Sequence, residues 1–133
     1  MAIDLSSFEL DAIVVQFSPA PSTREDLVRY AQASGDSNPL HLDPDFARQA
    51  GFDNLVVHGM LGMAHMGRLL SDNFDAERIR SFGVRFEGVV TVGQKVSYVA
   101  RFGESVPDGT TLVLEAVLEN GTRVISGKAL IAN

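Results

Sequence analysis

The chain has 133 residues, of which 45% are hydrophobic, and we expect residues 1–133 to fold as a single domain with a sizeable core. Its formal net charge of -6 at pH 7 argues against a general affinity for nucleic acid or for anionic membranes. The absence of cysteine excludes disulfides and thiolate chemistry, and it suits a cytoplasmic protein.

The first predicted element is a strand around residues 10–17, which ends at the breaker cluster Ser18-Pro19-Ala20-Pro21. The residues before the strand are acidic rather than basic, which argues against a signal peptide. The longest apolar stretch, residues 55–70, contains two histidines and an arginine and is too short to span a bilayer.

A helix and a polar loop are predicted next. Ser22 and Thr23 lie three residues before Glu25 and Asp26, which is the spacing of a capping box and predicts a helix from about residue 23 to residue 33. This helix is expected to stop at Ser34-Gly35, within the loop SGDSNPLH that follows it. A short helix is expected to begin near Asp43-Pro44, because proline is tolerated in a first turn.

A second long helix is expected from about Gly59 to Leu70, with the sequence GMLGMAHMGRLL. Apolar or glycine residues fall on nearly every side of it, which is typical of a helix enclosed by other elements. Gly62 and Gly67 each cost about 1 kcal/mol relative to alanine in a helix interior. We therefore expect a neighbouring element to pack very close to the helix backbone.

From Arg78 onward the apolar residues recur with a period of two, which predicts a run of antiparallel strands. Turn signals separate these strands at residues 92–94, 107–109 and 119–121. Helices followed by such strands imply an α+β fold, with the sheet packed on the apolar helix. Because one edge and one face of the sheet would remain uncovered, we also expect self-association.

Within SGDSNPLH, Asp36 and His41 place a carboxyl group and an imidazole on a loop stiffened by Pro39. If the loop folds back, the pair is able to hold one water and act as general base and acid, which contributes about 10²–10⁴-fold in rate. The same residue types are ordinary turn formers. A turn capped by Asp36, with His41 as partly buried packing, explains the pattern equally well.

The start of the apolar helix, at His58-Gly59, is a second candidate site. Free N–H groups and the positive end of the helix dipole favour a developing oxyanion there, and glycine lets a ligand approach the main chain. The alternative is that these residues only start the helix. His65, inside the helix, is interpreted as a core or interface histidine.

Other chemistries lack their sequence motifs. No two histidines have His-x-x-x-His spacing and no cysteine is present, so neither a metal nor another cofactor is expected. The sequence also contains neither a glycine-rich phosphate loop nor a G-x-S-x-G nucleophile elbow.

Residues 30–41 (YAQASGDSNPLH), with Gly51-Phe52 and HGML at 58–61, closely resemble the MaoC-like (R)-specific enoyl-CoA hydratases and (3R)-hydroxyacyl-carrier-protein dehydratases. The resemblance is close over residues 22–70 and looser in the later strands. It implies a hot-dog fold, in which a curved antiparallel sheet wraps around a central helix. It also implies a dimer with an acyl tunnel near the subunit interface.

The resemblance further implies roles for individual residues. Asp36 and His41 would be the catalytic pair, and the Gly59 N–H would bind the thioester carbonyl. Asn38 and His58 would be supporting residues, with Asn38 shaping the loop. The substrate would be a trans-2-enoyl thioester of coenzyme A or acyl carrier protein, hydrated to a (3R)-hydroxyacyl thioester or formed by the reverse dehydration.

One departure and three alternatives remain. Some hydratases have a serine that lines the site, and the corresponding position in this chain is at or near Gly67. This departure removes a secondary polar contact and does not affect Asp36 and His41. A hot-dog thioesterase would use Asp36 to activate water against the carbonyl carbon. A second alternative is that the chain is the catalytic subunit of a heterodimeric dehydratase and does not form a homodimer. The presence of both Asp36 and His41 disfavours a non-catalytic binding module.

Overall fold

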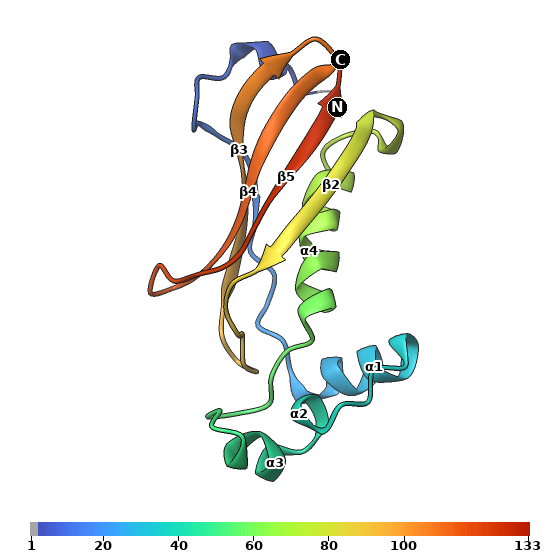
Figure 1. Ribbon diagram of the computed structural model, residues 1–133, viewed down its shortest axis with the longest axis vertical. Coiled ribbons are helices and arrows are strands. Elements are labelled where there is room, and N and C mark those ends of the chain that lie inside the picture. Colours follow the sequence, from blue (N-terminus) through green and yellow to red (C-terminus); the bar gives the residue numbers. More distant parts are fainter. Residues whose placement is uncertain (1–2) are drawn as a thin grey trace.

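The computed structural model describes residues 3–133 and contains a five-stranded sheet with one long helix along one face (Figure 1). The strands are β1 (Ile13–Phe17), β2 (Ile79–Phe86), β3 (Val96–Val106), β4 (Gly109–Leu118) and β5 (Arg123–Ala132). Neighbouring strands are antiparallel, in the order β1-β3-β4-β5-β2. Strand β2 therefore lies at the sheet edge beside β5, and not beside β3, which follows it in the chain.

The helices divide into two groups (Figure 1). They are α1 (Arg24–Ser34), α2 (Pro39–Leu42), α3 (Pro44–Gln49) and α4 (Gly59–Ser71), with 3-10 turns at Leu5–Ser7 and Ala76–Arg78. Helix α4 runs along the sheet, whereas α1, α2 and α3 gather beyond the end at which α4 begins. No helix in the described part of the chain is long and apolar enough to cross a membrane.

The predicted signals at the ends of α1 are confirmed. The Asp26 N–H donates to Thr23 Oγ1 at 3.2 Å, and the Thr23 N–H donates to the Asp26 carboxylate at 2.9 Å. Gly35 ends the helix with a left-handed φ of 80°. The first strand is shorter than predicted, because Asp11 adopts a φ of 66° in a turn and pairing begins only at Ile13.

From its turn residues we expected the segment SGDSNPLH to be a loop throughout, but this is only partly correct. Its second half forms α2, a single helical turn that begins at Pro39. The Asn38 side chain caps this turn by accepting a hydrogen bond from the Leu40 N–H at 3.0 Å. Proline at the first helical position loses no hydrogen bond, so the same residues favour a capped turn of helix. The predicted helix at Pro44 is confirmed as α3.

The sheet packs on the apolar helix, as predicted. The expectation that other elements enclose this helix on all sides is wrong for the single chain. Met66, Leu69 and Leu70 of α4 are fully buried in the core against the sheet. On the opposite side of α4, Met60 is 54% exposed, because the sheet covers only one face. A Cβ at Gly62 would lie 3.0 Å from Ile125 Cδ1, which confirms the expected close packing there.

Candidate active site

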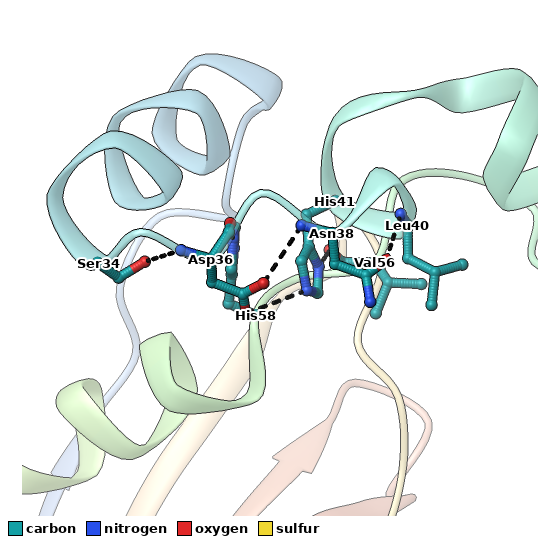
Figure 2. Close-up of polar contacts among 7 residues, drawn as sticks. All are labelled: Ser34, Asp36, Asn38, Leu40, His41, Val56 and His58. Carbon is teal, nitrogen blue, oxygen red and sulfur yellow. Dashed lines mark hydrogen bonds and ion pairs between the residues drawn. The ribbon is translucent and has the colours of Figure 1, made fainter.

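The segment after α1 folds back through consecutive side-chain hydrogen bonds (Figure 2). The Asp36 N–H donates to Ser34 Oγ at 3.2 Å, and the Asn38 N–H donates to Asp36 Oδ1 at 3.3 Å. Asn38 then caps α2, whose single turn places His41 beside Asp36. Asn38 therefore shapes the loop, as the sequence predicted, and its Oδ1 atom is engaged by the Leu40 N–H.

Asp36 and His41 lie together at the start of α2. His41 Nε2 is 3.6 Å from Asp36 Oδ2, which exceeds a direct hydrogen bond and allows both atoms to accept from one water. His41 Nδ1 is 2.6 Å from the Val56 carbonyl oxygen, so Nδ1–H is the donor and Nε2 carries the lone pair of the neutral ring. The His41 side chain is 11% exposed and that of Asp36 51% exposed.

His58 lies directly against His41, with the two ring centroids 3.8 Å apart and nearly parallel. Its Nε2–H donates to the main-chain oxygen of Asp36 at 3.1 Å, while the Tyr30 ring packs 4.8 Å away. Burial is the main cause that lowers the pKa of His58, and it outweighs the hydrogen bond to Asp36. Among residues 3–133 the buried Nδ1 atom has no partner. His58 is therefore a neutral support that ties the Asp36 loop to α4.

Gly59 is the first residue of α4, so its N–H has no acceptor within the helix. It lines a cavity of about 240 Å³ together with His41 and His58. A Cβ at position 59 would make an ordinary van der Waals contact with the Phe86 ring, at 3.5 Å. Asp36 is not among the residues that line the cavity, but its carboxylate lies beside His41, which does line it.

Three of the predicted site residues are of types that bind metal ions and lie close together. Asp36, His41 and His58 bring ligand atoms within 4.8 Å of one another. The two imidazole rings are stacked, however, and the ring nitrogens that keep a lone pair are His41 Nε2 and His58 Nδ1. Stacked rings present their nitrogens side by side, whereas a tetrahedral metal site requires them to point at one centre. The expectation of no metal site stays a prediction.

Two residues of the cavity were not assigned to it from the sequence. His65 of α4 lines the cavity rather than being enclosed in the core, and it is half-buried. Tyr98 of β3 lines the same space, although its only sequence signal was the alternation of a strand. Both positions depend on how α4 meets the sheet, which no local pattern encodes.

The chain is similar in sequence to known proteins. A family model described as MaoC like domain matches residues 9–105. The mitochondrial 3-hydroxyacyl-[acyl-carrier-protein] dehydratase of Arabidopsis thaliana is 42% identical over 72 residues, which cover 54% of this chain and 43% of that protein. The chain spans less than half the length of the curated relatives it matches.

Solved structures show the hot-dog fold that the sequence predicted. R-hydratase PhaJ1 from Pseudomonas aeruginosa matches with a TM-score of 0.83 at 23% identity, over 98% of this chain and 86% of that one. A chain of the ChsH1-ChsH2 complex from Mycobacterium tuberculosis matches with a TM-score of 0.79 at 16% identity, over 94% of this chain and 98% of that one. The chain is therefore an α+β hot-dog protein.

Proposed function

The chain belongs to the MaoC-like domain family, and from this we propose that it is a hydro-lyase that adds water reversibly to trans-2-enoyl thioesters. The product would be a (3R)-hydroxyacyl thioester. One observation carries the proposal: the Asp36 and His41 side chains are 3.6 Å apart, beside a cavity that contains the free N-terminus of α4. This arrangement offers a water-holding pair and an oxyanion donor to the same bound molecule.

The reaction follows from the hydrogen bonds of these groups. The thioester carbonyl accepts from the Gly59 N–H, which stabilises the charge that develops on its oxygen. Ionised Asp36 and neutral His41 hold a water whose oxygen attacks C3. As the C3–O bond forms, the π electrons of the C2–C3 double bond move toward the carbonyl oxygen. One of the pair takes a proton from the water and one returns a proton to C2, and dehydration is the reverse path.

The substrate carrier and the assembly belong to the same proposal. The thioester is one of coenzyme A or acyl carrier protein, and the working unit is a homodimer or a heterodimer with another hot-dog subunit. Support comes from the exposed Met60 beside Gly59 and from the exposed Phe86 and Val89 on the cavity lining. The ChsH1-ChsH2 complex is a precedent for pairing of two different chains.

The test follows two reactions on one substrate. Purified protein is incubated with crotonyl-CoA, and loss of the enoyl absorbance is recorded together with release of free thiol. Loss of the enoyl group without thiol release supports the proposal, whereas thiol release without hydration would assign a thioesterase. Activity that appears only on co-expression with a second hot-dog subunit would assign the heterodimer.

A further inference from the structure

Two polar side chains that line the cavity have no part in the proposed chemistry. The rings of His65, on α4, and Tyr98, on β3, have centroids 5.5 Å apart. The Phe17 ring lies 6.0 Å from His65 and 6.3 Å from Tyr98, and it closes one side of the pair. The Tyr98 hydroxyl lies 3.8 Å from the position of a Cβ at Gly62, on the cavity side of α4.

Neither the Tyr98 hydroxyl nor the His65 ring has a hydrogen-bond partner within residues 3–133, and both side chains line the cavity. Burial raises the pKa of Tyr98 to about 12, so the phenol keeps its proton as a donor. Burial also lowers the pKa of His65, so the neutral ring offers one donor and one acceptor. A ligand that fills the cavity and excludes water would therefore either pair with these two groups or leave them without a hydrogen bond, which is unfavourable.

A saturated acyl tail would not satisfy these groups. The cavity around them is apolar, with Val96 and Ile125 among its lining residues, so a plain alkyl chain would cover the hydroxyl and the imidazole without pairing them. A chain that carries an oxygen at this depth would accept a hydrogen bond from Tyr98 and exchange one with His65. The apolar wall and the two polar groups together therefore favour a substrate whose acyl chain is apolar except at one carbon that carries an oxygen.

The depth of this polar pair can be estimated from the helix. His65 is six residues after Gly59, which is about 9 Å along the axis of α4. If the thioester carbonyl lies at the Gly59 N–H, the pair lies well beyond C3. We propose that the preferred substrate is an enoyl thioester whose acyl chain carries a hydroxyl or carbonyl oxygen near its far end, bound by Tyr98 and His65. This inference rests on the proposed hydratase function.

The test compares matched substrates on the intact protein. Hydration rates are measured for trans-2-octenoyl-CoA and trans-2-decenoyl-CoA and for their ω-hydroxy analogues, with crotonyl-CoA as a substrate too short to reach the pair. We expect kcat/KM to be about two- to tenfold higher for an ω-hydroxy analogue than for its parent, since the net contribution of one hydrogen bond has this size. Equal kcat/KM values, or a preference for the plain chains, would overturn the inference.

Variants assign the preference to the two side chains. Tyr98→Phe removes only the hydroxyl, and His65→Leu removes the ring nitrogens; each should lower the ratio of hydroxylated to plain kcat/KM toward one. Tyr30→Phe removes the only other tyrosine hydroxyl of the chain and should keep the wild-type ratio. A merely structural role would lower both kcat/KM values and leave their ratio unchanged, which would also count against the inference. Failure to hydrate crotonyl-CoA and every longer substrate would instead contradict the proposed function itself.

Discussion

At the scale of single residues, the candidate pair is asymmetric, because the imidazole of His41 is buried and the carboxylate of Asp36 is half-exposed. Asp36→Asn keeps the size and the hydrogen bond from the Asn38 N–H but removes the negative charge that accepts a proton. We expect hydration of crotonyl-CoA to fall by about 10²–10⁴-fold while the unfolding midpoint stays near that of the wild type. Asp53→Asn, at an exposed aspartate, is the matched control. Near-normal turnover of the Asp36 variant would refute its catalytic role.

His58 should make the stability of the protein depend on pH. Burial lowers the pKa of His58 from its ordinary value of 6.5, so below that pH the unfolded chain binds a proton that the native chain does not. The free energy of unfolding should therefore fall as the pH drops below about 6.5. Urea unfolding at pH 7.5 and pH 5.5 measures the fall, and His58→Gln should reduce it. His65 contributes a fall of the same sign, because burial lowers its pKa too. An equal fall in wild type and His58→Gln would contradict the prediction.

The candidate site could be predicted from the sequence only in part, for a physical reason. Asp36 and His41 are five residues apart, and the turn residues between them encode the fold-back that brings them together. Gly59 was assigned because a helix start has a local signature. By contrast, the stacking of His58 on His41 and the approach of Tyr98 to His65 join residues far apart in sequence. Such contacts depend on how whole elements pack, which local patterns do not specify.

At the scale of elements, the pairing of β2 with β5 depends on the small size of one residue. Gly127 of β5 lies opposite Val84, and a Cβ at position 127 would clash with the main-chain oxygen of Gly83. Since a backbone atom cannot move without disturbing the ladder, Gly127→Ala should destabilise the protein by about 1–3 kcal/mol in urea unfolding. Gly83→Ala, in the same ladder, meets no atom within 4 Å and should change stability by less than about 0.5 kcal/mol. Equal effects of the two variants would disprove this packing.

The elements themselves were predictable to the extent that their ends carry local chemistry. The capping box at Thr23 and the hairpin turns at 107–109 and 119–121 placed α1, β4 and β5 correctly. The helical turn at Pro39 was missed because proline and asparagine favour loops and helix starts alike. The position of β2 at the far edge of the sheet was not predicted, because strand order is decided by long-range pairing.

At the scale of the whole molecule, the chain leaves apolar surface beside its own site. We call Met60, Phe86 and Val89 the apolar rim; all three are exposed, and Phe86 and Val89 line the cavity. The uncovered face of α4 begins at this rim. The sequence predicted a helix enclosed on all sides, and a second subunit would provide the cover that the sheet of one chain does not.

A second subunit on the apolar rim predicts a measurable mass. Sedimentation equilibrium of the purified protein at micromolar concentration should give the mass of two chains, because exposed apolar contacts of this kind favour association. Phe86→Asp places a charge on the rim and should shift the equilibrium toward single chains. Val113→Asp, at an exposed apolar residue of β4 that does not line the cavity, should leave the mass unchanged. If the wild-type protein hydrates crotonyl-CoA at full rate as a single chain, the apolar rim needs no partner. If it is a single chain that becomes active only with a second hot-dog subunit, the apolar rim is a heterodimer surface.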